Sequence, residues 1–241
     1  MKRTISVILT VLLLVLSAFA LVACDGGIKT EEDWNKALDY LANCDAVTIT
    51  VEETIVEMNH LVDKDKVKHK LIVAFDAKQG VVFSKYYFTS YFAIGIVEDR
   101  SRGEQYYIAD GNKLCHYSRK LGESATDWEG QVWKRYENSD EVVQEQRNMY
   151  LRAEYSYETK YMDLTALNYF SFYQDKNKFV RSEKEEYYDT TIELTFSNGR
   201  LTKVSYERIQ KASGPKDSRK YTITIKYKAK ISVPNNLPKV N

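Results

Sequence analysis

Residues 191–210, TIELTFSNGRLTKVSYERIQ, are the segment that most clearly indicates the fold. Two runs in which apolar and polar residues alternate lie on either side of Asn198-Gly199. An Asn-Gly pair between such runs is the strongest short-range signal for a two-residue β-hairpin turn. Asp110-Gly111 marks a second turn of this kind. Because a tight hairpin joins strands that run in opposite directions, the sequence predicts an antiparallel sheet.

The composition and the other runs of alternating apolar and polar residues predict further strands in this sheet. The chain has 19 Tyr and 9 Phe but only 3 Pro, which is typical of a protein rich in strands. A change of phase near Glu52-Glu53 predicts a β-bulge, because the residues that follow take the other parity. We expect about nine to eleven strands in all. Further strands are expected at residues 47–58, 67–75, 81–88 and 131–136.

The segment 221–231 predicts a long last strand with one buried face, because apolar residues occupy every second position. Lys226, Lys228 and Lys230 fall on the other face and form a basic stripe. Such a stripe either keeps a sheet edge soluble or meets anionic lipid headgroups.

Two amphipathic helices are expected, each followed by several hairpins. The first begins at Thr30, a good N-cap with acidic residues in the next turn, and continues to about Asn43. Its apolar face consists of Trp34, Ala37, Leu38 and Leu41. The second is expected over residues 140–152 with Asn138 or Ser139 as its cap, and a short third one over 164–170. The expected fold is therefore α+β: a curved antiparallel sheet, with two or three helices packed on its concave face to bury their apolar stripes.

The N-terminus has the layout of a secretory signal. Lys2 and Arg3 precede an uncharged segment that ends at Ala23, and its strongest apolar stretch, residues 7–16, is short for a membrane span. The sequence LVAC that ends at Cys24 resembles the bacterial lipobox. By that resemblance residues 1–23 are cleaved, and Cys24 receives a diacylglyceryl group whose two chains suffice for anchoring. The alternative is an uncleaved anchor with an incidental cysteine.

These features imply a protein held by lipid on the extracytoplasmic face of the cell membrane. Residues 24–29 would form the tether, 30–238 a single α+β domain and 239–241 a tail. Without residues 1–23 the chain has 33 basic and 34 acidic residues, a balance that does not favour a nucleic-acid partner. Cys44 and Cys115 remain, and in an exported protein they can form a disulfide or stay as buried thiols.

The lipobox, the capped helix TEEDWNKALDYLANC at 30–44, the Tyr-rich hairpins and the closing YTITIKYKAKISVP at 221–234 together resemble a poorly characterised family of Gram-positive lipoproteins. That family resembles the LolA/LppX-like half-barrel fold, whose understood members carry or sense acyl chains or lipoproteins. The resemblance covers most of residues 29–238 and implies no particular ligand residue. A shared fold leaves the function open.

No motif in the sequence indicates an enzyme, a metal site or a bound cofactor. His60, His69 and His116 lack the spacing of a metal site, and no nucleophile elbow, phosphate-binding loop or dinucleotide fingerprint occurs. We therefore expect a non-enzymatic protein with no cofactor and no catalytic or metal residues.

An aromatic run at residues 86–96, YYFTSYFAIGI, is the clearest candidate for a ligand-binding surface. It suits either an ordinary core or the wall of an apolar pocket between the sheet and the helices. The resulting hypothesis is a membrane-anchored lipoprotein that binds an apolar ligand, such as a lipid or acyl chain, or another envelope component. The alternative is a protein-binding or regulatory lipoprotein with a filled core. The candidate wall residues are Trp34, Leu38, Tyr86, Phe88, Tyr91 and Phe92.

Overall fold

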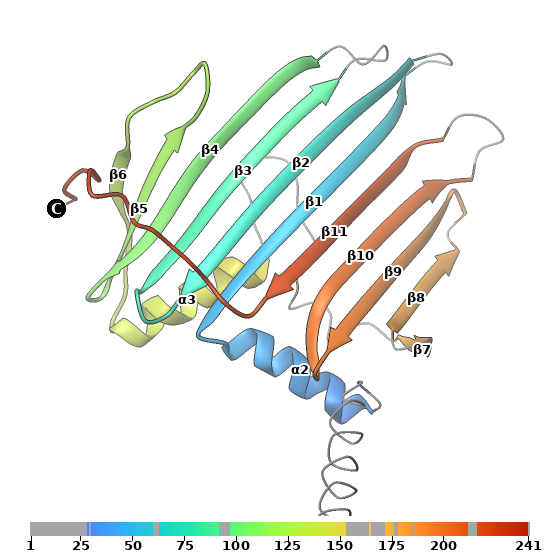
Figure 1. Ribbon diagram of the computed structural model, residues 1–241, viewed down its shortest axis with the longest axis horizontal. Helices are drawn as coiled ribbons and strands as arrows, with labels where there is room; N and C mark the ends of the chain where they lie inside the picture. Colours follow the sequence, from blue (N-terminus) through green and yellow to red (C-terminus); the bar gives the residue numbers. More distant parts are fainter. Residues whose placement is uncertain are drawn as a thin grey trace, which may run out of the picture.

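Within the part of the chain that the structure describes, eleven strands form one open antiparallel sheet that is accompanied by two helices (Figure 1). The computed structural model describes residues 28, 30–59, 63–91, 97–152, 164, 172–175, 178–184, 186–211 and 216–240. The expected antiparallel sheet is confirmed. The helices are α2 (Glu31–Asn43) and α3 (Ser139–Arg152), and the strands are β1 (Ala46–Asn59), β2 (Asp63–Asp76), β3 (Val81–Tyr91), β4 (Val97–Asp110), β5 (Lys113–Lys120), β6 (Glu129–Arg135), β7 (Tyr173–Asp175), β8 (Lys178–Lys184), β9 (Tyr188–Ser197), β10 (Arg200–Gln210) and β11 (Ser218–Lys226).

The sheet consists of two meanders that meet in its middle. Strands β1 to β6 lie side by side in chain order, strands β7 to β11 do the same, and β1 pairs with β11. Helix α2 precedes the first meander and α3 precedes the second, as the sequence led us to expect. Of the short third helix expected over 164–170, only Leu164 lies within the described residues.

The local signals that start the elements are present in the structure. Thr30 and Asp33 form a capping box at the start of α2, and the Asn138 side chain accepts from the Glu141 amide at 3.0 Å at the start of α3. Asn198 and Gly199 have φ angles of 51° and 68°, the left-handed pair that a type I′ hairpin turn requires.

The expected bulge at Glu52-Glu53 is wrong. Strand β1 keeps an unbroken register with both β2 and β11, so Glu53 occupies an inward position that alternation would give to an apolar residue. Its carboxylate is buried and accepts from Arg219 Nε on β11 at 2.5 Å. The Arg219 guanidinium compensates the charge of the buried carboxylate. Because Arg219 lies on a strand far away in the sequence, the local pattern could not predict this ion pair.

The expectation of one strand over 221–231 also needs correction, because β11 ends at Lys226. The Lys228 amide donates to the Lys226 carbonyl at 2.8 Å, which turns the chain out of the ladder. The C-terminal segment, residues 228–240, then crosses the sheet on the face opposite to the helices, in front of β1 to β4 (Figure 1). An extended segment that packs on a sheet also alternates apolar and polar residues, so the pattern does not distinguish it from a strand. Lys226, Lys228 and Lys230 therefore do not form a stripe along one strand.

The two faces of the sheet differ in what packs on them. One face, here called the helix-side face, carries Val47, Val73, Val82 and Val204 and the large core that α2 and α3 complete. Helix α2 contacts β10 and α3, and α3 contacts β2 to β5.

The opposite face, here called the open face, carries a smaller cluster beneath the C-terminal segment. Ile231 is buried there against Ala74, Val81, Tyr106 and Trp128, and the Tyr106 hydroxyl donates to the Ser232 carbonyl at 3.0 Å. The view in Figure 1 is onto this open face, with α3 behind the sheet.

Candidate functional site

The candidate wall residues of the first helix lie in the large core. Trp34 is buried, and its ring centroid lies 5.0 to 5.7 Å from those of three phenylalanines: Phe172, Phe179 and Phe196. Leu38 is buried in the same cluster. These contacts place the N-terminal half of α2 over β8 and β9.

The structure does not bring the remaining wall residues to this place. Tyr86 and Phe88 are on the helix-side face of β3, five strand spacings from β9, or about 24 Å. Tyr91 has the opposite parity and lies on the open face, where the Lys68 ammonium is 5.5 Å from its ring centroid. Phe92 and the proposed lipid attachment residue Cys24 lie outside the described residues. The six residues therefore do not line one surface.

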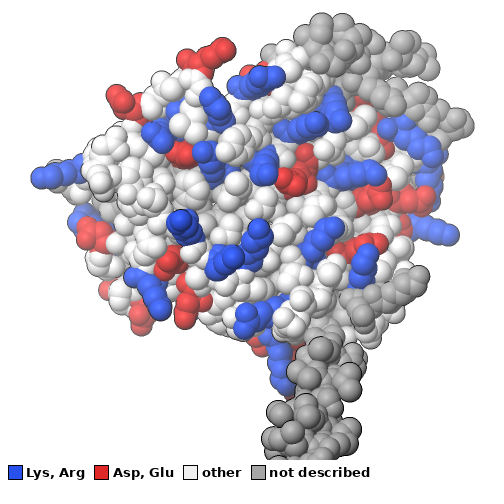
Figure 2. Space-filling model, in the orientation of Figure 1, with Lys and Arg blue, Asp and Glu red and all other residues white. Residues whose placement is uncertain are grey.

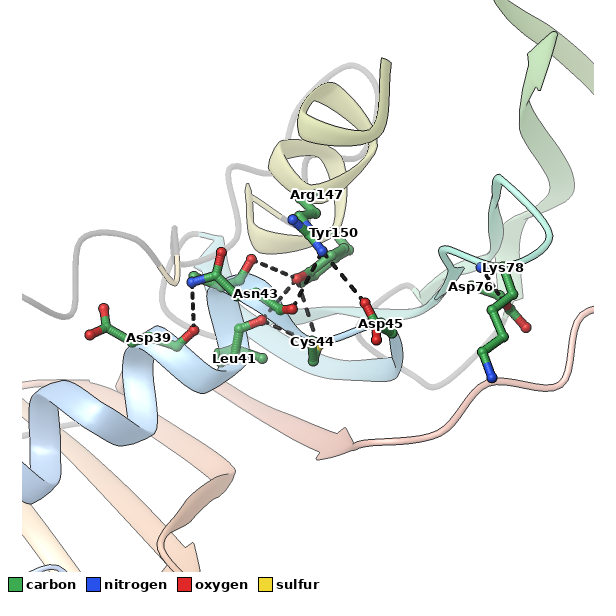
Figure 3. Close-up of polar contacts among 10 residues, drawn as sticks. Asp39, Leu41, Asn43, Cys44, Asp45, Asp76, Lys78, Arg147 and Tyr150 are labelled. Atoms are coloured by element: carbon green, nitrogen blue, oxygen red, sulfur yellow. Dashed lines mark hydrogen bonds and ion pairs between the residues drawn. The ribbon is translucent and has the colours of Figure 1, made fainter. Parts of the chain in front are cut away.

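A set of polar contacts ties α3 to the C-terminal end of α2 (Figure 3). The Tyr150 hydroxyl is 2.8 Å from the Leu41 carbonyl and 3.2 Å from that of Ala42, and Arg147 is 3.4 Å from the Asn43 carbonyl. The last carbonyls of a helix have no partner within the helix, and a cation there also opposes the helix dipole. Tyr150 and Arg147 thus complete the end of α2. Burial raises the pKa of Tyr150 far above its usual value, so the hydroxyl remains a donor.

Cys44 and Cys115 are free and buried on opposite faces of the sheet. Cys44 Sγ lies 3.3 Å from the Leu41 carbonyl and 3.7 Å from the Tyr150 hydroxyl. Burial raises the pKa of both thiols, which disfavours the reactive thiolate. Of the alternatives for this pair, the structure contains two separate thiols.

Gln146 fixes α3 to the sheet. Its side chain is fully buried, and Nε2 donates to the Gly80 carbonyl at 2.8 Å and to the Tyr107 carbonyl at 3.2 Å. One amide thus joins the helix to the turn before β3 and to β4.

The two described histidines are packed against aromatic rings. The His69 ring lies 4.8 Å from Phe88, and the His116 ring lies between Tyr107 at 4.6 Å and Trp133 at 5.6 Å. Burial lowers the pKa of His116, so the neutral imidazole is favoured. Within the described part of the chain, no group of three or more His, Cys, Asp or Glu side chains could hold a metal ion. We therefore interpret both histidines as residues that pack against aromatic rings.

Several acidic residues on the open face are paired with bases. Glu104 bridges Lys85 and Arg119, each at 2.7 Å. Burial raises the pKa of Glu104, but the two cations lower it by more, so its pKa lies below the usual value. Three further acids pair with one base each: Glu52 with Lys70, Glu193 with Lys178 and Glu207 with Lys220.

Four bases on the same face form no ion pair with any described residue. Lys66 and Lys68 lie on β2, and Arg100 and Arg102 on β4, with β3 between them. We name these four residues the basic patch. Lys68, Arg100 and Arg102 are exposed and Lys66 is half-buried. Figure 2 shows Lys and Arg side chains across the open face, including the upper ends of β2, β3 and β4.

The sequence analysis missed the basic patch, although its signal is local. In the run KVKHKL at 66–71 the lysines alternate with Val67, His69 and Leu71, and in RSR at 100–102 the arginines are two residues apart. In strands this spacing places the bases on one face. Only the pairing of β2 and β4 with β3 shows that the two runs lie on the same face.

Comparison with known proteins gives this chain no family. No family model matches the sequence, and no curated protein was found that is similar to it. No helix among the described residues is long and apolar enough to span a bilayer.

Proposed function

We propose that this chain is a lipid-anchored protein of the extracytoplasmic membrane face that binds an envelope component through its exterior and performs no chemistry. Cys24, at the end of a signal-like segment, would carry the lipid. In this proposal the sheet is curved like a half-barrel, as in LolA-like lipoproteins, and α2 and α3 cover its concave face.

The observation that carries an exterior site is the contrast between the two faces. On the helix-side face Trp34 contacts three phenylalanines and Tyr150 stacks on Phe75 at 5.1 Å, so side chains of both helices pack directly on core aromatic residues at these two places. On the open face, four cationic side chains have no acidic partner among the described residues. This favours the alternative of a protein-binding or regulatory lipoprotein, which acts through its exterior, over a carrier that encloses its ligand.

One observation supports a second candidate, the binding of a lipid or acyl chain. Tyr86, Phe88 and Tyr206 are only half-buried on the helix-side face, and aromatic side chains in such positions suit an apolar ligand. Organic extraction of the purified chain followed by mass spectrometry decides between the two. The exterior-binding proposal predicts no stoichiometric lipid beyond the covalent anchor, and a stoichiometric acyl ligand would establish the carrier.

Anchoring is tested by Cys24→Ser with Cys115→Ser as the matched control. We expect the wild-type chain and the control in the membrane fraction, with the intact mass of a cleaved and acylated protein. The Cys24→Ser chain should lack the lipid mass and leave the membrane fraction when its signal is removed. An unchanged, membrane-bound mature species for Cys24→Ser would refute the anchor.

A further inference from the structure

We propose that the basic patch binds a linear polymer of phosphate groups. The inference deepens the proposed function, on which it rests, because it names the chemistry of the envelope component. The site consists of Lys66, Lys68, Arg100 and Arg102.

The first argument is the uncompensated charge of these side chains. The neighbouring acids on this face, Glu52 and Glu104, are already bound to Lys70 and to Lys85 and Arg119. Side chains two residues apart on a strand are about 7 Å apart, within the screening length at physiological salt. The like charges therefore repel one another, and an anion that binds several of them at once removes that repulsion.

The second argument is the position of the patch within the sheet. Charged side chains often protect the edge strands of a sheet against further pairing. Strands β2 and β4 are interior, since the edges are β6 and β7. Edge protection thus does not explain the basic patch.

The third argument is geometric. Lys68 on β2 and Arg100 on β4 both face Thr89 on β3, so two rows of cations run along the sides of one strand. The rows are two strand spacings apart, about 10 Å. A chain of phosphates that follows β3 would meet cations on both sides, and the arginine fork matches phosphate oxygens well.

Two other anionic partners, single-stranded nucleic acid and a membrane surface, fit the basic patch less well. Single-stranded nucleic acid binds open sheets by stacking bases on aromatic faces. Here the ammonium groups of Lys68 and Lys85 already lie over the rings of Tyr91 and Tyr87, at 5.5 and 5.6 Å.

A membrane surface is disfavoured by position. Lys68 pairs with Thr54, eight residues along β1 from Ala46, which places the patch about 26 Å from the end of the sheet where α2 joins β1 (Figure 1). An anchor that precedes α2 holds the other end of the sheet at the bilayer.

The test is binding of the purified full chain to long-chain inorganic polyphosphate, measured by fluorescence anisotropy over a range of salt concentrations. The patch variant combines Lys68→Gln, Arg100→Gln and Arg102→Gln. The control combines Lys178→Gln, Lys211→Gln and Lys220→Gln, which removes the same charge from exposed bases of the same face that have acidic partners.

We expect the patch variant to bind at least about tenfold more weakly at about 50 mM salt, and the slope of log K against log salt to fall by about 2 for three lost cation–phosphate contacts. The control should keep the wild-type slope. Equal losses in both variants, or equal or tighter binding to polyglutamate, single-stranded DNA or anionic vesicles, would overturn the proposal. Because this assay is independent of Cys24, failure to bind polyphosphate while Cys24 still anchors the chain would reject the patch alone, and loss of anchoring with binding intact would reject only the anchor.

Discussion

The helix-side face and the open face belong to the same eleven strands, yet alternate residues of those strands build two different surfaces. The helix-side face carries the larger cluster of buried apolar side chains, which α2 and α3 contact, and the buried acid Glu53 on that face has Arg219 as a partner. The open face carries a small apolar cluster under the C-terminal segment and, beyond it, charged side chains exposed to solvent. The helix-side face thus contains most of the buried apolar side chains, whereas the open face leaves many charged side chains in contact with solvent.

The largest difference between the faces should appear when one phenylalanine is removed from each. Phe75 is fully buried on the helix-side face, whereas Phe83 is half-buried on the open face. We expect Phe75→Ala to lower the free energy of unfolding by about 4 kcal/mol and Phe83→Ala by about 1.5 kcal/mol. Urea unfolding of both variants measures this, and similar losses would show that the two clusters contribute equally.

The C-terminal segment should open separately from the sheet. Ile231→Ala removes the main apolar contact of this segment with the open face, so we expect faster amide exchange or proteolysis at 228–240 and a global loss of about 2 kcal/mol. Exchange read by mass spectrometry should leave β1 and β11 protected. Equal deprotection of those strands would mean that the segment is an integral part of the core.

The Tyr150 hydroxyl makes the shortest hydrogen bond between the two helices. Tyr150→Phe removes the buried hydroxyl that donates to the carbonyls of Leu41 and Ala42, and we expect a loss of about 2 kcal/mol. Tyr40→Phe is the matched control, because Tyr40 is 40% exposed and water can replace its contacts. Thermal or urea unfolding should separate the two variants, and equal stabilities would contradict the role assigned to Tyr150.

The smallest effect concerns pH. Burial lowers the pKa of His116 below 6.5, so the unfolded chain takes up a proton first as the pH falls. Stability should therefore decrease as the pH falls through 6.5 and level off below the folded pKa. His116→Phe should flatten this part of the curve between about pH 7.5 and pH 5.5. An unchanged slope would indicate that the imidazole is solvated in the folded chain.

Local signals predicted the parts of the fold that depend on neighbouring residues. The Thr30 cap, the Asn198-Gly199 turn and the apolar stripe from Trp34 to Leu41 each act within a few residues, so the sequence contained them. The inward Glu53 could not be predicted, because its partner Arg219 is 166 residues away.

The same reason explains what was missed in the candidate site. The turn after Lys226 and the basic patch both depend on which strands become neighbours. Alternation gives the face of each residue within its own strand, but it does not give the order of the strands. The proposed wall, from Trp34 to Phe92, grouped residues by their type. In the structure Trp34 contacts Phe179 on β8, whereas Tyr86 lies on β3, and the strand order places these two strands far apart.

The central claim is that the open face of an anchored protein is exposed outside the membrane. Intact cells that express the full chain can be treated with a membrane-impermeant amine-reactive ester and the modified lysines identified by mass spectrometry. The account predicts rapid modification of Lys68, which is exposed, and slow modification of Lys85, whose ammonium is held by Glu104 at 2.7 Å. Modification of Lys68 only after lysis of the cells would contradict it.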